Sequence, residues 1–378
     1  MRLWRYCLAG CLFDWMLYVV LTVIPLHAND LGASARELGV LGACSAIVYV
    51  GLSVVLGRVA DRVSRPLLVR IGCGVMIAAC VLIPRADSIA VLLALTPVVG
   101  ASGTFFWPGV QAAIAAESTP ERLGRDLGLF NIFWSTGKAG GFLTAAALKG
   151  GIGVGPTLLV AAAGAGAIAL FYPLRDVRRA AEPAETPDRG TALLHMSWIM
   201  NFVGYGVGAT VANQYIKLCK ARQLGLGIGA DPAEFFLGAF LCAVFLSQTA
   251  AFVALRTLRG WTHRRAPLHA GFLAMAAGGL MVAFLSDARV LLLAAPLLGV
   301  GFGIAYAASI YYSLHATREL GAYSGLHEAI LGSGGFLMPL AAGWLATQSG
   351  DLRWPYWLCA GAALAGAAAA ECLWRRRR

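Results

Sequence analysis

Runs of about 20 apolar residues recur from one end of this chain to the other, and this pattern limits the possible folds more than any other feature. Of the 378 residues, 59% are hydrophobic and only 13% are charged, and the mean hydropathy is +0.71. Soluble proteins carry about 25% charged residues, and their cores do not hide so many runs of this length. The pattern therefore predicts an integral membrane protein.

Hydropathy averaged over about 19 residues predicts twelve transmembrane helices. They are expected near 7–26, 38–57, 67–84, 90–114, 127–148, 152–173, 192–213, 234–255, 268–285, 290–314, 325–346 and 355–374. Each run is about twice as long as a membrane strand and lacks strict alternation, which argues against a β-barrel. The charged stretch 175–190 divides an N-terminal six-helix bundle, 1–174, from a C-terminal one, 191–378. The fold class is all-α.

The distribution of basic residues predicts the orientation of the helices. When both termini are placed on the cytoplasmic side, 21 of the 30 Lys and Arg residues lie on that side and 8 lie outside. Cytoplasmic loops carry an excess of Lys and Arg, so we expect a multi-pass protein of the plasma membrane with both termini and the linker in the cytoplasm.

The net charge of +11 does not indicate a nucleic-acid partner, because the basic residues form short clusters between apolar spans. The nine cysteines are scattered, without a C-x-x-C pair, and predict neither disulfides nor a metal site. No nucleophile with a neighbouring base is evident across the spans. We expect no cofactor and no enzymatic activity, and a monomer surrounded by lipid.

Short motifs repeat between the two halves of the chain. Gly137 recurs 197 residues later as Gly334, together with Leu-Gly and Gly-Leu pairs at the same offset, and Gly100 recurs 199 residues later as Gly299. A duplicated six-helix unit is typical of transporters that rock two halves around a site near the middle of the membrane. The repeats predict pseudo-symmetric bundles with a binding site between them.

The predicted loop after the second helix carries a known signature. Its sequence from Gly57 to Arg65 reads G-R-V-A-D-R-V-S-R and resembles the motif G-x-x-x-D-R-x-G-R of the major facilitator superfamily, at the expected place between spans two and three. Gly57, Asp61, Arg62 and Arg65 match, whereas Ser64 replaces a glycine. With twelve spans and an internal duplication, the resemblance covers nearly the whole chain.

The resemblance implies a gating role for this loop. Asp61 would hold the start of the span at 325–346 while the two halves touch on the cytoplasmic side, because a carboxylate accepts the free amides of a helix N-terminus. Arg62 would reach Asp126. The alternative is an ordinary basic cytoplasmic turn.

Three ionisable residues fall within predicted spans, where a charge costs about 2.5 to 3.5 kcal/mol and is a functional candidate. They are Asp14, Lys138 and Glu328. The resemblance implies that Asp14 and Lys138 lie on neighbouring helices, where they form either a structural ion pair or a site for substrate or a proton. Glu328 is a candidate for proton coupling; it is alternatively a capping carboxylate or a substrate contact.

Aromatic and amide residues within the spans predict the lining of a central cavity. The candidates are Trp107, Gln111, Asn131, Trp134, Asn201, Tyr205, Tyr306 and Tyr311. Aromatic rings with a few amides suit an amphipathic organic molecule, although a residue of this kind taken alone more often serves helix packing.

These features predict a secondary transporter that works by alternating access and exports a small organic molecule in exchange for protons. Many proton-coupled members of the superfamily carry an arginine in the fourth helix, but the span 90–114 contains no basic residue, so the sequence does not indicate their usual charge relay. The alternatives are uptake or facilitated diffusion of a small polar metabolite, and a membrane scaffold without transport activity.

Overall fold

The computed structural model describes residues 3–59, 63–173, 190–258, 260–315 and 320–376, and almost all of them are helical. These ranges contain no β-strand and twelve long helices of 18 to 33 residues. The long helices are α1 (Leu3–Asp30), α2 (Ala35–Val59), α3 (Arg65–Leu82), α4 (Ile89–Glu117), α5 (Pro120–Ile152), α6 (Val154–Phe171), α7 (Gly190–Ala221), α8 (Pro232–Thr257), α9 (Ala266–Phe284), α11 (Ala294–His315), α12 (Leu320–Ser349) and α13 (Trp354–Arg376). The remaining elements are a short helix, α10 (Ala288–Leu291), and two 3-10 turns, η1 (Ile83–Arg85) and η2 (Trp261–His263).

The all-α prediction and the twelve predicted spans are confirmed, and each span lies within or largely overlaps one long helix. Ten of these helices are long and apolar enough to cross a membrane. The described residues of α5 and α7 do not meet these conditions of length and composition. Both are nonetheless packed inside the bundle, α5 against α1 and α8, and α7 against α12 and α13. Several of their polar side chains are buried between helices, among them Asn131 and Lys138 of α5 and Asn201 and Gln214 of α7, as expected for a membrane protein that encloses a polar site.

Local sequence signals explain where several helices begin. Proline stands in the first turn of α3, α5, α8 and α9, where its missing amide hydrogen costs nothing. Asp231 precedes α8 and accepts the amides of Ala233 and Glu234, each at 3.0 Å. Only Gly153 separates α5 from α6, and its φ of +82° is a conformation that other residues rarely adopt.

The helices form two halves that repeat each other. In the first half α1 packs against α4, α5 and α6, while α4 packs against α2 and α3; in the second half α7 packs against α11, α12 and α13, while α11 packs against α8 and α9. The equivalent pairs match one for one when α1–α6 correspond to α7, α8, α9, α11, α12 and α13. The predicted duplication is therefore visible as a repeated packing arrangement.

The repeated glycines make the same contacts in both halves. A Cβ added at Gly137 would collide with the backbone of α1, and one at Gly334 with the equivalent backbone of α7. Likewise, a Cβ at Gly100 would collide with the α2 backbone and one at Gly299 with the α8 backbone. These residues are glycines because two helix backbones touch there, as is common between membrane helices.

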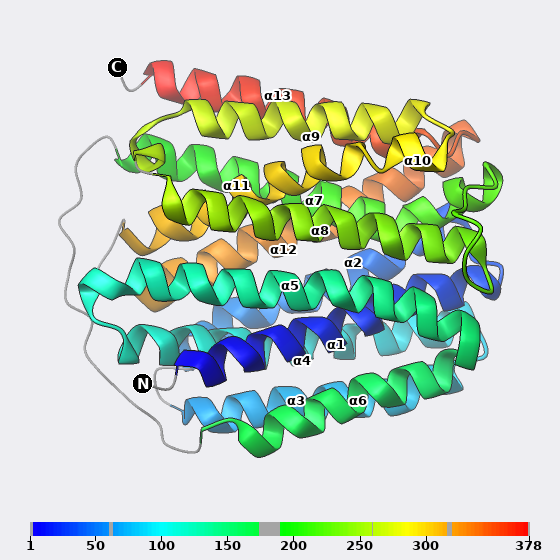
Figure 1. Ribbon diagram of the computed structural model, residues 1–378, viewed down its shortest axis with the longest axis horizontal. Coiled ribbons are helices and arrows are strands. Elements are labelled where there is room, and N and C mark those ends of the chain that lie inside the picture. Colours follow the sequence, from blue (N-terminus) through cyan, green and yellow to red (C-terminus); the bar gives the residue numbers. More distant parts are fainter. Residues whose placement is uncertain (1–2, 60–62, 174–189, 259, 316–319, 377–378) are drawn as a thin grey trace.

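The two halves lie side by side, and the start of α1 and the end of α13 lie at the same end of the molecule (Figure 1). We call this end the terminal end and the other the distal end. The seam between the halves consists mainly of α2 against α12 and α7, α5 against α8, and α1 against α7. The residues between α6 and α7 that join the halves, 174–189, lie outside the described residues.

Candidate functional site

A cavity of about 190 Å³ lies along the seam. Its wall is formed by α1, α2, α4 and α5 of the first half and by their counterparts α7, α8, α11 and α12 of the second. The other four long helices, α3, α6, α9 and α13, contribute none of its described lining residues. The cavity therefore occupies the place at which a two-half transporter binds its substrate.

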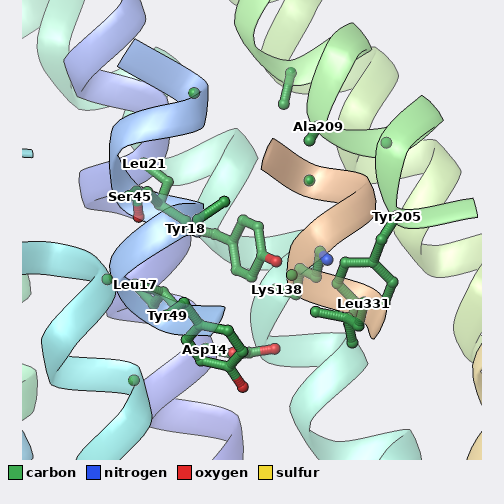
Figure 2. Close-up of a pocket in the computed structure, with 18 of the residues that line it drawn as sticks. Asp14, Leu17, Tyr18, Leu21, Ser45, Tyr49, Lys138, Tyr205, Ala209 and Leu331 are labelled. Atoms are coloured by element: carbon green, nitrogen blue, oxygen red, sulfur yellow. The ribbon is translucent and has the colours of Figure 1, made fainter. Parts of the chain in front are cut away.

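Lys138 of α5 projects into this cavity, and its side chain is only 4% exposed. Its ammonium group lies 4.0 Å from the ring centre of Phe245, 4.1 Å from that of Tyr18 and 5.3 Å from that of Tyr205. Figure 2 shows the ammonium group between the two tyrosines. Phe245 and Tyr205 belong to the second half, so this cation–π contact crosses the seam. Such contacts contribute about 2 kcal/mol when desolvated, less than the cost of burying the charge.

Asp14 of α1 lies on the same cavity wall and is 3% exposed. Its carboxylate has no hydrogen bond and no ion pair within 4.0 Å among the residues that the structure describes. The direct Asp14–Lys138 ion pair considered from the sequence is thus not formed, because the ammonium group lies against the aromatic rings. The cavity holds two opposite charges without direct partners.

Glu328 of α12 is the third ionisable residue of the cavity, and it joins the two halves. The Tyr49 hydroxyl on α2 donates a hydrogen bond of 2.6 Å to one carboxylate oxygen, and the Gln111 amide on α4 donates one of 3.1 Å to the other. Glu328 is therefore not a capping carboxylate at the start of α12. The sequence predicted Glu328 and Gln111 as separate candidates. It did not predict Tyr49, because no cluster of polar residues on α2 distinguishes that tyrosine from its neighbours.

The remaining predicted lining residues divide into two groups. Trp107, Trp134, Tyr205 and Tyr306 line the cavity, and Trp134 of the first half meets Tyr306 of the second edge to face, with ring centres 4.9 Å apart. Aromatic rings thus cover both sides of the seam.

Three predicted lining residues lie elsewhere. Asn131 accepts a hydrogen bond from the indole of Trp134 on its own helix, Asn201 is buried beside His327, and Tyr311 packs against Trp261 near one end of α11. Like Gln111, which holds Glu328, these three residues are not among the described residues that line the cavity, because the sequence identifies polar residues within a span but not the direction in which each points.

The predicted gating motif is only partly visible. Asp61 and Arg62 lie outside the described residues, whereas Gly57 lies near the end of α2. Arg65 is the first residue of α3 and is largely buried. Asp126, the expected partner of Arg62, accepts a hydrogen bond of 2.9 Å from the Ser118 hydroxyl.

A second polar contact between the halves lies at the distal end and was not predicted. Lys149 of α5, in the first half, lies 2.8 Å from Glu234 of α8, in the second, and 2.6 Å from Asp30 at the end of α1. Lys220 of α7 completes the group, 3.2 Å from Asp231 and 3.5 Å from Glu234. We call these five residues the distal cluster. The sequence does contain opposite charges at helix ends that are predicted on the same side of the membrane. Their spacing along the chain does not show which of them form pairs.

Asp231 of the distal cluster lies outside the membrane-spanning segments. Partial burial by itself raises its pKa, but the Glu234 amide and the Lys220 ammonium group stabilise the carboxylate and hold the pKa below its ordinary value. The Asp231 carboxylate is therefore charged at neutral pH.

Comparison of the sequence with known protein families identifies the family of this chain. The model of the Major Facilitator Superfamily matches residues 6–339 and, in a second overlapping match, residues 263–378. The chain belongs to the major facilitator superfamily. It is accordingly a multi-pass membrane protein of a transporter superfamily, and the resemblance inferred from the Gly57–Arg65 motif is confirmed.

Solved structures of superfamily transporters share the fold. A bacterial homolog to the human lysosomal transporter Spinster, in an inward-facing and occupied conformation, matches with a TM-score of 0.70 over 99% of this chain and 96% of that one, at 15% identity. A mutant of the nucleoside transporter NupG matches with a TM-score of 0.74 over 98% and 99% of the two chains, at 13% identity. At such identities the likeness concerns the fold alone.

One curated relative is more similar in sequence over a shorter stretch. Multidrug resistance protein 1 of Bacillus subtilis (strain 168) is 31% identical over 130 residues. The match spans a third of this chain and a third of that protein.

Proposed function

We propose that this member of the major facilitator superfamily exports a small amphipathic organic molecule in exchange for protons, by alternating access. The observation that carries the proposal is Glu328, a buried carboxylate on the cavity wall that is held by hydrogen bonds from the opposite half. The partial match to Multidrug resistance protein 1 supports export.

Glu328 couples a proton to the movement of the halves. As a carboxylate it accepts one hydrogen bond on each oxygen, from Tyr49 and from Gln111. Protonation removes the negative charge and turns one oxygen into a donor, which weakens both contacts, because hydrogen bonds to charged acceptors are about twice as strong as neutral ones. Protonation therefore loosens α12 from α2 and α4, and release of the proton restores the contact.

Two further contacts control the ends of the cavity in this proposal. Asp61 latches the terminal end, in the cytoplasm, and the distal cluster closes the outer end through the Lys149–Glu234 pair. Both contacts join the halves and exist only while their end is closed. The six-helix halves, 1–174 and 191–378, then move as units about the linker 175–190 in the plasma membrane.

Proton flux in proteoliposomes tests this function. The purified protein is reconstituted with a pH-sensitive dye inside, and amphipathic amines, acids and amino acids are added with and without an imposed pH gradient. We expect at least one class of compound to drive proton movement, and Glu328→Gln to reduce it at least tenfold. Glu371→Gln, on α13 outside the cavity, is the matched control and keeps the flux.

The alternatives give different results in the same assay. Compound flux that moves no protons and ignores the gradient would contradict the exchange and favour facilitated diffusion. Full proton coupling in a well-folded Glu328→Gln protein would remove Glu328 from the mechanism.

A further inference from the structure

The charges of the cavity indicate the chemical class of the substrate. Lys138 and Asp14 both line the cavity, and both are more than nine-tenths buried. No described residue accepts a hydrogen bond from the Lys138 ammonium group or donates one to the Asp14 carboxylate. A buried charge without a hydrogen-bonding partner is unfavourable, so a molecule that enters the cavity with the opposite charges would stabilise the charged form of each group.

The two charges stand at the same level on adjoining helices. Around them α1 and α5 touch through their backbones, at Gly137 and at Gly141, which meets the carbonyl of Trp15. An ion pair between Asp14 and Lys138 would be the simplest way to satisfy both, yet the Lys138 ammonium group lies instead on the rings of Tyr18 and Phe245. The open cavity therefore presents a separated positive and negative charge.

Glu328 does not serve as the missing partner of either group. Both of its oxygens already accept hydrogen bonds, from Tyr49 and Gln111. Trp107, Trp134 and Tyr306 cover other parts of the wall with apolar ring surface. Within the described part of the chain, the site thus combines a cation that contacts only aromatic rings, an anion without a hydrogen-bonding partner, and an aromatic surface.

We propose that the substrate is zwitterionic and resembles an amino acid with an apolar side chain. Its anionic group binds Lys138, its cationic group binds Asp14, and its apolar part packs on the aromatic rings. An organic cation alone would leave Lys138 without an acceptor, and an organic anion would leave Asp14 without a donor. The inference rests on the proposed transport function and names its substrate class.

Equilibrium binding to the purified full-length protein tests this, without any pH gradient. The probes are L-phenylalanine, phenethylamine and 3-phenylpropanoate, which share a phenyl group and differ in charge, and the matched series L-leucine, 3-methylbutylamine and 4-methylpentanoate. We expect the zwitterion of at least one series to bind at least tenfold more tightly than its amine and its acid. Preference for the zwitterion in neither series overturns the proposal, whether the other probes bind or not.

Charge-removing variants then separate a direct contact from a structural role. Lys138→Met is expected to lose at least tenfold in zwitterion affinity and to shift the preference toward the amine, whereas Asp14→Asn shifts it toward the acid. Lys138→Arg keeps the positive charge and the preference for the zwitterion, and Lys217→Met, on α7 outside the cavity lining, is the matched control. Equal losses for all three probes in both variants would show a structural role and contradict the proposal.

The outcome is independent of the test of proton exchange. Selective zwitterion binding without proton flux would contradict the exchange and leave the substrate class standing. Proton flux driven only by amines or only by acids would overturn the substrate class and support the exchange.

Discussion

Replacing Lys149 by glutamine should open the distal end of the molecule. Lys149 bridges the halves by contacting Glu234 at 2.8 Å and Asp30 at 2.6 Å, and Glu234 is only 2% exposed. The variant leaves the Glu234 carboxylate buried with Lys220, at 3.5 Å, as its remaining cationic partner. The substitution therefore destabilises the closed arrangement, in which Glu234 is buried. It does not destabilise the open arrangement, in which Glu234 reaches water.

The size of the effect follows from the geometry of the cluster. Removing one partner of a buried ion pair costs about 3 to 5 kcal/mol, and the remaining contact with the partly exposed Lys220 lowers this to about 2 to 3 kcal/mol. One factor of ten corresponds to about 1.4 kcal/mol, so the ratio of closed to open molecules should fall about 30- to 150-fold.

Distance measurements between spin labels at the distal end report this ratio. Suitable label positions are Gly151→Cys at the end of α5, where an added Cβ meets open space, and Ile228→Cys before α8, where the side chain is 57% exposed. Cys372, an exposed native cysteine, is replaced by serine. We expect Lys149→Gln to shift the distribution from short to long distances.

The exchange of charges provides the decisive control. Lys149→Glu combined with Glu234→Lys restores an ion pair across the seam and should recover part of the short-distance population, although Asp30 and Lys220 then each lie beside a like charge. Lys217→Gln, on the same helix as Lys220 but outside the cluster, should leave it unchanged. An unaltered distribution in a folded Lys149→Gln protein would refute the role of the cluster in closing this end.

Three further predictions concern packing, pH and proton coupling. Gly137→Ala should cost about 1 to 3 kcal/mol, because the added methyl group meets the α1 backbone, whereas Gly151→Ala on the same helix should not lower the melting temperature. If the melting temperatures of the two variants agree, the close contact is not required. The lowered pKa of Asp231 stabilises the folded protein above the ordinary carboxyl pKa, and this contribution is lost as the pH falls through the folded value. The stability difference between wild type and Asp231→Asn should therefore begin to shrink as the pH falls below about 4 and vanish once the pH is below the folded pKa, and a difference that does not shrink in acid would contradict the assignment. Tyr49→Phe removes one hydrogen bond to Glu328 and should reduce proton flux several-fold while leaving equilibrium binding of L-phenylalanine within about twofold; unchanged flux would show that this hydrogen bond does not matter.

The sequence predicted the features that depend on composition and periodicity. A run of apolar residues as long as a bilayer is thick must form a helix there, so the spans could be located, and the repeated glycines marked the positions where backbones touch in both halves. The cost of burying a charge also identified Asp14, Lys138 and Glu328 as functional candidates, and all three line the cavity.

The contacts across the seam could not be predicted in this way. Whether Lys138 pairs with Asp14 or lies on Phe245 depends on how close α8 comes to α5, which no local pattern records. The same limit explains the unforeseen contact of Tyr49 with Glu328, 279 residues apart in the chain, and the misplaced Tyr311. Helix periodicity gives the relative directions of side chains on one helix, but not which direction faces the partner.

Access to the cavity from the two sides of the membrane tests the account most directly. A cysteine at Ala209, on the cavity wall, is introduced into a variant without native cysteines and exposed to a membrane-impermeant thiol reagent from either side of oriented vesicles. We expect reaction from both sides, with Lys149→Gln raising the rate from the distal side and lowering it from the terminal side. Reaction from one side alone, at a rate that Lys149→Gln does not change, would contradict alternating access.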